Sequence, residues 1–536
     1  MKKRIIVCCD GTWQNSDGGY VKPTSSNPVP TLQIPSNVTR ISRAFKRDCS
    51  DGTFQIVYYH SGVGTGPGSL AKLLGGAFGI GIAENIREAY SFICANYVDG
   101  DEIILIGFSR GAFTARSVGG MISDLGLLTR EGMEFFYPVF KDMQNWMNPD
   151  YKDQFPELPF SGKPKGLHAP ENYRRMLLEK GYTRVHEKKG QGDLISVKAI
   201  GVWDTLDETR GPFSPTLWER QPEDQDVSDL RQVWFPGTHG NVGGGWADQG
   251  IANGMMDQLS SVGCEFIPDA AEILYDRNVQ YYHSLKSKGP GVKKGVKRYG
   301  FGAVSLKIPL PWAAPPIFDP ENPVRPWSLH GIRSVTSPLY DIIGSVTRSP
   351  GLYKRINPEG RHHLRIFLND TNERIHSSVR VRLACEGLGV NDSNVWDCPA
   401  LLKMWHPRRV AQDFVDPVPN DAGWGPNSES SGRQALSDIT NRVLDGAGST
   451  SVDVSDDAGG SGVGAATQEN DPSHGLRWVW EYVGPEASAP HVRTLVEETM
   501  GPWEKRLLEL SAGKVHVCEY ASKQEVSKFR ALVAKS

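Results

Sequence analysis

The sequence lacks several features that would assign it to a special class of protein. Its 536 residues contain no uninterrupted apolar run of the ~18 residues that a membrane-spanning helix needs, so we expect no transmembrane segment. The formal net charge is −3 and no long run of lysine or arginine occurs, so nothing favours binding to nucleic acid. The apolar run at residues 5–9 is too short for the core of a secretory signal, and we interpret it as a buried strand.

Cysteine is also scarce. The eight cysteines, two of them adjacent and the rest scattered, form neither a disulfide framework nor the spacing of a zinc site. We therefore expect reduced, mostly buried thiols and a cytoplasmic location, and we expect no metal or organic cofactor. With 39 % hydrophobic and 23 % charged residues, the composition is that of a globular protein with a large core.

The first half of the sequence alternates short apolar runs with helical patterns. Apolar positions between residues 82 and 97 repeat at helical spacing, with charged residues opposite. The runs expected to form strands are 5–9, 54–59, 102–106, 194–203 and 232–235. Strands separated by helices predict an α/β fold of the α/β-hydrolase type, with a mostly parallel sheet flanked by helices and with cap-like insertions.

We expect one catalytic domain over residues 1–410, with two insertions. These lie at about 130–190 and 285–360, and their aromatic, proline and charged residues do not fit the alternation of strands and helices. We interpret the first insertion as a cap over the edge of the sheet.

The end of the chain changes in composition. Residues 418–472 are rich in Gly, Ser, Asp and Ala and can bury little apolar surface, so we predict a disordered linker. Residues 473–536 are expected to form an extension that packs on the core. Its strand-like stretches LRWVWEYV and KVHVCEYA flank the helix-like stretch TLVEETMGPWEKRLLEL.

The stretch GFSRGAFTAR, residues 107–116, places a serine between two glycines directly after an apolar run. Serine is a poor nucleophile unless a base and an acid that orients the base lie nearby. A nucleophilic serine on a sharp turn between strand and helix needs small neighbours, because the turn is crowded. Gly107, Gly111 and a following helix of small residues fit this requirement and predict Ser109 as the nucleophile. The alternative is a turn serine that caps the helix.

The acid and the base are expected later in the chain, each in a loop after a strand. Asp204 ends one apolar run, and His239 follows the next, so both suit the order of this fold. The spacing leaves competing candidates open: two acids, Asp207 and Asp248, and one base, His60.

An oxyanion hole needs two backbone N–H groups near the reacting carbonyl. Arg110, the residue after the nucleophile, is expected to supply one, and the turn at Gly11 or Thr12 the other. Asp10 is expected to brace that turn. The alternative role of Asp10, a metal ligand, lacks a second cluster of acidic residues.

A glycine-rich loop follows the strand at residues 54–59. The loop, residues 62–68, lacks the Gly-Lys-Ser/Thr ending of a nucleotide-binding P-loop, so we interpret it as part of the substrate-site rim. Asp10, His60 and Gly62 are the residues expected at this rim. The apolar stretch 69–82 is interpreted as core, with a mobile lid or a lipid-facing edge as the alternative.

Seven motifs occur in a recognisable order: CCDGTW, SNVTRI, YYHSGVGTG, NIREAYSFI, GFSRGAFTAR, GVWDT and WFPGTHGNVGGGW. Together they resemble an α/β-hydrolase family of uncharacterised proteins, abundant in filamentous fungi, that includes the catalytic domain of type VI secretion phospholipase effectors. The resemblance covers roughly residues 1–260 and continues through ERIHSSVRVRL at 373–383. It implies a catalytic triad of Ser109, Asp204 and His239.

The resemblance also implies hydrolysis of carboxylic esters, which are phospholipid acyl esters in the bacterial effectors. The expected partner is therefore a small-molecule or lipid ester, with transient contact at a membrane surface. Two alternatives remain open at this stage. One is transfer of the acyl group to an acceptor other than water, and the other is an idle hydrolase scaffold that binds a ligand or partner.

Overall fold

The structure is a computed structural model. It describes residues 2–11, 20–21, 31–32, 35–62, 78–184, 195–205, 215–221, 228–244, 251–269, 298–299, 303–304, 332, 346–356, 363–384, 389–390, 396–411, 476–498, 500–504 and 506. Several predictions lie outside these residues: the linker 418–472, the strand-like KVHVCEYA, most of the glycine-rich and apolar stretches at 62–82, and the side chains of Thr12, Asp207 and Asp248.

The first sheet has four parallel strands in the order β4-β1-β5-β8. They are β4 (Phe54–His60), β1 (Lys3–Cys9), β5 (Glu102–Phe108) and β8 (Ala199–Trp203). Cys9 pairs with His60 on one side and Gly107 on the other, and Phe108 pairs with Trp203, so the carboxyl ends of all four strands meet at one edge. The α/β class with a parallel sheet is confirmed.

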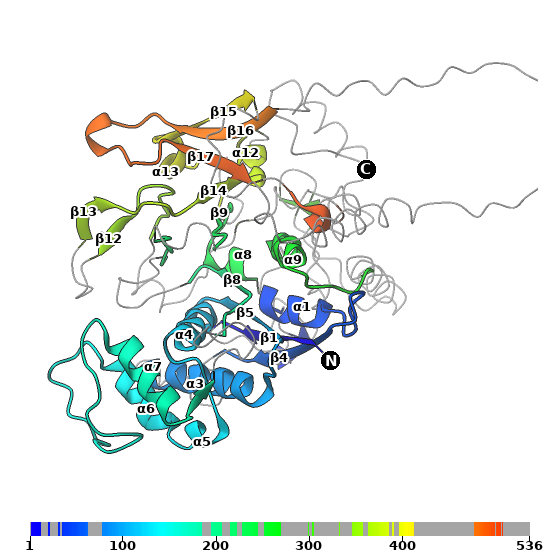
Figure 1. The fold of residues 1–536 in the computed structure, drawn as a ribbon. Coiled ribbons are helices and arrows are strands. Elements are labelled where there is room, and N and C mark those ends of the chain that lie inside the picture. Colours follow the sequence, from blue (N-terminus) through cyan, green and yellow to red (C-terminus); the bar gives the residue numbers. More distant parts are fainter. Residues whose placement is uncertain are drawn as a thin grey trace, which may run out of the picture.

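Helices cover both faces of this sheet (Figure 1). The pairs are α1 (Asn37–Ala44) with α9 (Ile251–Ser261), and α3 (Phe78–Asn96) with α4 (Arg110–Leu125). Alternate residues of β1 serve the two faces: Ile6 and Cys8 pack with α1 and α9, whereas Ile5 and Val7 pack with α3 and α4. A strand buried on both sides must be apolar throughout, which is why its sequence shows no alternation.

The described part of the first insertion, up to residue 184, does not cover the carboxyl edge of the sheet. It contains β6 (Leu127–Leu128), α5 (Arg130–Met133), α6 (Phe136–Gln144), α7 (Ala169–Glu179) and β7 (Thr183–Arg184). Arg184 donates to the carbonyls of Cys94 and Tyr97 at the far end of α3, and Phe136 stacks on Tyr90. The expectation of a cap is therefore wrong for this segment. Its helices lie beside α3 and α4 instead (Figure 1), and its aromatic residues pack in the same hydrophobic core.

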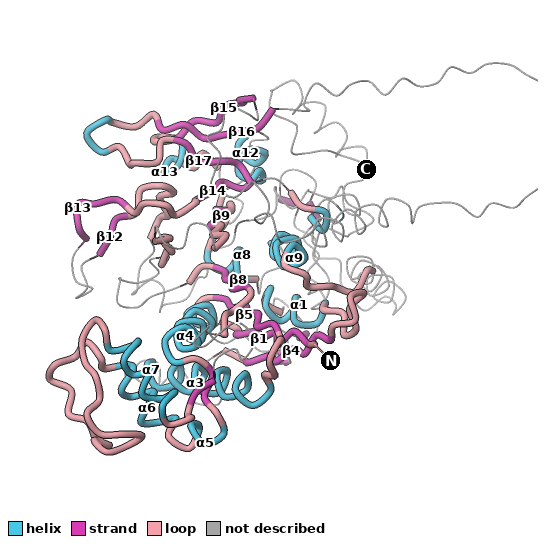
Figure 2. The backbone as a smooth tube through the Cα atoms, viewed as in Figure 1, coloured by secondary structure: helices cyan, strands magenta, loops and turns pink. Residues whose placement is uncertain are grey.

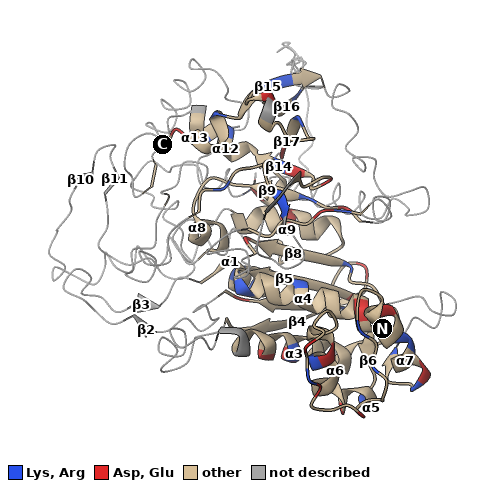
Figure 3. Ribbon diagram, turned by 90° about the vertical axis from the view of Figure 1, so that its left-hand side faces the viewer, with Lys and Arg blue, Asp and Glu red and all other residues tan. Residues whose placement is uncertain are grey.

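A second sheet has five strands in the order β15-β16-β17-β14-β9. They are β15 (Trp405–Ala411), β16 (Leu476–Tyr482), β17 (Thr494–Glu498), β14 (Glu373–His376) and β9 (Gln232–Trp234). We expected β9 in the first sheet, but it pairs in parallel with β14, through Val233 and Arg374 among others. Figures 1 and 3 both place β9 beside β8, so the second sheet continues the line of the first.

The C-terminal strands correct one prediction. LRWVWEYV forms β16 as expected, but Thr494–Glu498, expected to begin a helix, is a strand between β14 and β16 (Figure 2). Val496 pairs with Arg374 on one side and Val479 on the other. Two neighbouring strands thus pair with the backbone N–H and C=O groups of a segment whose local pattern also suits a helix. Tertiary pairing outweighs that local preference.

The remaining described elements are short. They are β2 (Tyr20–Val21), β3 (Thr31–Leu32), α8 (His239–Gly243), β10 (Arg298–Tyr299), β11 (Ala303–Val304), β12 (Lys354–Ile356), β13 (His363–Phe367), α12 (Ser377–Ala384), α13 (Pro399–Leu402) and a 3₁₀ turn at Glu486–Ser488. None of the helices in the described part of the chain combines the length and apolar character needed to cross a bilayer.

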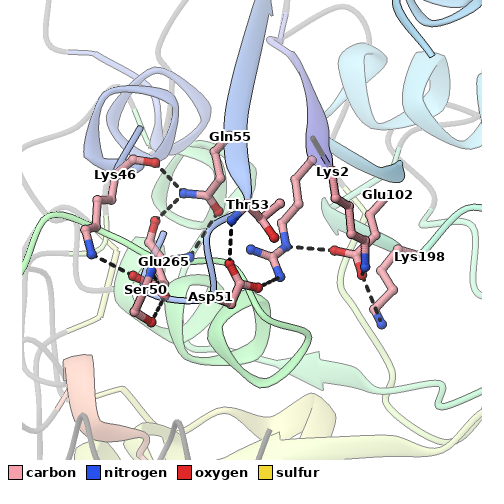
Figure 4. A network of polar contacts seen from close by, with 10 residues as sticks. Lys2, Lys46, Ser50, Asp51, Thr53, Gln55, Glu102, Lys198 and Glu265 are labelled. Atoms are coloured by element: carbon pink, nitrogen blue, oxygen red, sulfur yellow. Dashed lines mark hydrogen bonds and ion pairs between the residues drawn. The ribbon is translucent and has the colours of Figure 1, made fainter. Parts of the chain in front are cut away.

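A network of charged side chains holds the amino edge of the first sheet (Figure 4). Arg4, only 4 % exposed, donates to Glu102 and to Asp51, at 2.7 Å in each case, and Lys2 donates to Glu102 at 2.9 Å. These bonds tie β1 to β5 and to the turn before β4. The site described next lies at the opposite edge.

The same edge holds three residues close enough together to bind a metal ion: Cys49, Asp51 and Glu265. Asp51 already accepts from Arg4, and Glu265 accepts from Lys46 at 2.9 Å. Burial raises the pKa of the Cys49 thiol, which favours the protonated form. We assign this cluster a structural role.

The cysteines of the described residues are free thiols, as expected, and all but Cys398 are buried. Burial raises the pKa of Cys9, Cys94 and Cys264 to about 12, so these side chains are protonated and unreactive at neutral pH.

Candidate active site

Ser109 occupies a strained turn between β5 and α4. Its φ of 57° and ψ of −120° are unusual for a residue other than glycine, and its N–H donates to the carbonyl of Trp203 at 3.0 Å. The flanking glycines are required by space. A Cβ at Gly107 would lie 2.4 Å from the carbonyl oxygen of Gly111, and a Cβ at Gly111 would lie 2.1 Å from that of Cys9. The turn thus brings the hydroxyl to the carboxyl edge of the sheet.

His239 links Ser109 to Asp204. Its Nε2 lies 2.9 Å from Ser109 Oγ, and its Nδ1 lies 2.7 Å from Asp204 Oδ2. An ionised Asp204 accepts the proton on Nδ1, and Nε2 then carries the lone pair that can accept the serine proton. The structure therefore brings together the three residues expected to form a triad.

Asp204 is held as a carboxylate by its contacts with His239 and Arg348. It directly follows β8 and has a left-handed conformation, with φ of 38°. Burial alone would raise the pKa of Asp204, but the hydrogen bond and charge of His239, followed by the charge and hydrogen bond of Arg348, lower it. Nη2 of Arg348 lies 2.9 Å from Oδ2 and 3.2 Å from Oδ1.

Two features of the surrounding structure position His239. His239 is the first residue of α8, and Thr238 before it bonds to the side chain of Asn241, which fixes the start of this helix. The ring of Phe108 packs on the imidazole with centroids 4.7 Å apart. Gly243 leaves room for that ring, because a Cβ there would lie 1.9 Å from Phe108.

Asp10 is buried beneath the turn that follows β1. Its Oδ2 accepts from the hydroxyls of Ser36 at 2.5 Å, Tyr59 at 2.6 Å and Thr39 at 2.9 Å, and its Oδ1 accepts the N–H of Gly11 at 2.7 Å. Burial raises the pKa of Asp10, and the four hydrogen bonds only partly oppose that rise. Asp10 therefore fastens the turn, as expected.

The Gly11 turn lies against Ser109. A Cβ at Gly11 would be 3.4 Å from Cβ of Ser109 and 2.6 Å from the ring of Phe108. However, the N–H of Gly11 already donates to Asp10, which argues against Gly11 as an oxyanion donor. Thr12, the alternative donor, lies outside the described residues. Arg110, the other expected donor, is the first residue of α4 and directly follows Ser109.

Of the residues expected at the rim, Gly62 contacts the turn after β1, whereas His60 is paired elsewhere. Gly62 packs on the turn, since a Cβ there would lie 1.6 Å from the carbonyl oxygen of Gly11. His60 lies at the end of β4, but its Nε2 contacts Glu88 at 2.5 Å and its Nδ1 contacts the carbonyl of Ser61 at 2.8 Å. As the competing base, His60 is thus paired with Glu88, whereas His239 contacts Ser109.

The start of α1 connects Asp10 to the helix of His239. Ser36 caps α1 by accepting the N–H of Thr39 at 3.0 Å and also donates to Asp10. Asn37 donates from its side chain to the carbonyl of Val242 in α8 at 2.8 Å. These bonds place the turn after β1 and the start of α8 on one rigid support.

Sequence reasoning missed two residues of the site. Phe108 is part of the GFSRG motif. Its position between two tightly packed glycines is the sequence feature that could have indicated a role in the site. Arg348 lies in an irregular proline-rich stretch, 144 residues after Asp204, and no local pattern marks it.

Comparisons with known proteins agree with the motifs. A model of the type VI secretion phospholipase effector Tle1-like catalytic domain matches residues 3–206 and 205–267. An uncharacterised protein of Saccharomyces cerevisiae is 27 % identical over 213 residues, which span 37 % of this chain and only 27 % of the yeast protein. No solved structure matches the chain. The resemblance seen in the motifs is therefore confirmed, since residues 3–267 match the model of the Tle1-like catalytic domain.

Proposed function

We propose that the chain is a serine hydrolase of the α/β-hydrolase type that cleaves carboxylic esters of lipids. The observation that carries the proposal is the chain of contacts from Ser109 Oγ to His239 and on to Asp204, at 2.9 Å and 2.7 Å. Nucleophile, base and orienting acid lie at hydrogen-bonding distances, and the nucleophile occupies the strained strand-to-helix turn that this chemistry uses.

In the proposed mechanism, Nε2 of His239 takes the proton of Ser109 as Oγ attacks the ester carbonyl. The N–H of Arg110, at the N-terminus of α4, stabilises the oxyanion together with the positive end of the helix dipole. His239 then gives the proton to the departing alcohol, which leaves the acyl group on Ser109. Water, deprotonated by the same histidine, releases the acid and restores the serine. Asp204 orients the imidazole and stabilises its charged form.

The proposal of a lipid substrate rests on the family. The matched model describes the catalytic domain of phospholipase effectors, and this supports a lipolytic reaction in general. Phospholipid acyl esters are the substrate class that we propose first. The matched residues contain Ser109, Asp204 and His239, so all three proposed catalytic residues come from the region shared with that family.

We further propose that the catalytic unit extends to about residue 410, well beyond the matched residues. β9, which precedes His239, pairs with β14 at 373–376, and Arg348 contacts Asp204. The site thus draws on parts of the chain that lie after residue 267.

Fatty-acid release from phosphatidylcholine vesicles, and from soluble p-nitrophenyl esters of several chain lengths, tests this function. We expect hydrolysis by the wild type, its loss in Ser109→Ala, and its retention in Ser123→Ala, a matched change on the exposed part of the same helix. Hydrolysis of soluble esters without release of fatty acid from the vesicles would overturn the proposal of a lipid substrate. Failure of the wild type to hydrolyse any ester would overturn the proposal that the chain is an ester hydrolase.

A further inference from the structure

Arg348 contacts the carboxylate of the proposed triad. Its Nη2 lies 2.9 Å from Asp204 Oδ2, the same oxygen that lies 2.7 Å from Nδ1 of His239, and 3.2 Å from Oδ1. The Asp204 side chain is only 11 % exposed and that of Arg348 22 % exposed. A single guanidinium nitrogen that contacts both oxygens opposes rotation of the carboxylate about its Cβ–Cγ bond.

The segment that carries Arg348 is anchored to the second sheet. The carbonyl of Pro350 accepts from the indole of Trp405 in β15 at 3.0 Å, and the N–H of Gly351 donates to Glu373 in β14 at 2.9 Å. Gly351 has a φ of +71°, and a Cβ there would lie 2.5 Å from Trp405. The backbone next to Arg348 therefore has a defined place.

The other charged and titratable groups around this contact are few among the described residues. His239 faces Asp204 from α8, and Tyr353 lies behind Arg348, where its hydroxyl accepts the N–H of Ser349 at 3.2 Å. Glu373 is buried and bonded to Trp234 at 3.0 Å, and Trp234 stacks on Tyr353 with centroids 5.7 Å apart. Among the described residues, Arg348 is the permanently charged cation in contact with Asp204.

We infer that Arg348 is a positioning residue of the hydrolase, supplied by a loop anchored to the second sheet, that holds the Asp204 carboxylate in the orientation in which Oδ2 contacts His239. The inference rests on the proposed function. It adds a fourth residue to the proposed triad, from a part of the chain that lies outside the matched family region.

Two physical effects support this role for Arg348. Asp204 has a strained backbone, with φ of 38°, and without Arg348 its side chain keeps one described partner, His239. Misorientation of the carboxylate by about 1 Å misplaces the imidazole and costs roughly 100-fold in rate. In addition, a cation beside the carboxylate disfavours protonation of the coupled histidine–aspartate pair, so its removal favours the protonated, inactive form at higher pH.

The test is the second-order rate constant for labelling by a fluorophosphonate, measured across pH for the full chain. We expect Arg348→Ala to slow labelling about 10- to 100-fold and to move the acidic limb of the profile to higher pH. Arg348→Lys retains the positive charge but not the planar guanidinium group, so it should slow labelling less and leave the limb in place. Guanidinium ion, at tens of millimolar, should partly restore Arg348→Ala.

Arg355→Ala is the matched control, because Arg355 lies on β12 of the same segment and is paired with Glu219 at 2.7 Å near the surface. It should label as fast as the wild type. An unreactive wild type would overturn the proposed function itself. A reactive wild type with Arg348→Ala as fast as the control would overturn only this inference. Slow labelling of Arg348→Ala with an unmoved acidic limb and no guanidinium rescue would overturn it too, because a purely structural defect gives that result.

Discussion

Gly111 and Cys9 approach so closely that a Cβ atom on Gly111 would lie 2.1 Å from the carbonyl oxygen of Cys9. The first turn of α4 therefore packs directly against the end of β1. This contact sets the height of Ser109 above the sheet and its distance from the Gly11 turn. The second glycine of the G-x-S-x-G motif does not have a positive φ. It is required because no Cβ atom fits at this position.

Gly111→Ala should therefore damage the protein although alanine favours helices. The methyl group must push α4 away from β1, which we expect to lower the free energy of unfolding by about 1–3 kcal/mol and to slow ester hydrolysis. Urea denaturation measures the first effect. Gly120→Ala, on the exposed side of the same helix with nothing within 4 Å of the added Cβ, should instead stabilise the protein by about 0.5–1 kcal/mol. Equal stability changes in the two variants would contradict this account.

The two histidines considered as bases should respond oppositely to replacement. His239→Gln removes the atom that lies 2.9 Å from Ser109 Oγ, so we expect hydrolysis to fall by a factor on the order of 10³ or more. His60→Gln should retain most of the activity, because His60 is paired with Glu88. Steady-state kinetics on a soluble ester measures both. Greater loss in His60→Gln than in His239→Gln would reverse the assignment.

The ion network at the amino edge of the sheet predicts a pH-dependent contribution to stability. Burial by itself raises the pKa of Glu102, but the hydrogen bond from Lys2 and the charges of Arg4 and Lys198 outweigh it, so the pKa lies below the ordinary 4.5. A lowered pKa in the folded state means that the stabilisation is complete above 4.5 and is lost as the pH falls through the folded pKa.

Glu102→Gln should accordingly lower the free energy of unfolding at pH 7 by about 1–2 kcal/mol. The difference from the wild type should shrink as the pH falls toward 3. Thermal or urea denaturation across this range measures it, and Glu157→Gln, on an exposed loop residue, provides the matched control. A difference that grows toward low pH would show that the sign is wrong.

Much of the fold and of the candidate site could be predicted from local sequence patterns. Strands β1 and β5 are continuous apolar runs, and Ser109 sits between glycines directly after one of them, so both could be predicted from a few neighbouring residues. Asp204 and His239 each follow a strand, and the family motifs singled them out from their competitors. The structure places the three side chains in contact, while their catalytic role stays a prediction.

The rest depends on pairing between distant segments. β9 was predicted as a strand but not as a partner of β14, 139 residues later, because a strand of three residues does not encode its neighbour. Thr494–Glu498 suits a helix locally and becomes a strand because β14 and β16 flank it. Arg348 meets Asp204 only through the folding of the second sheet, so no local signal could indicate it.

The most direct test of the central claim is covalent labelling with a fluorophosphonate, followed by mass spectrometry of the digested protein. The account predicts one label per chain, on the peptide that contains Ser109, with no label in Ser109→Ala that circular dichroism shows to be folded. Labelling of the folded wild type on another residue, or labelling that persists in Ser109→Ala, would contradict it.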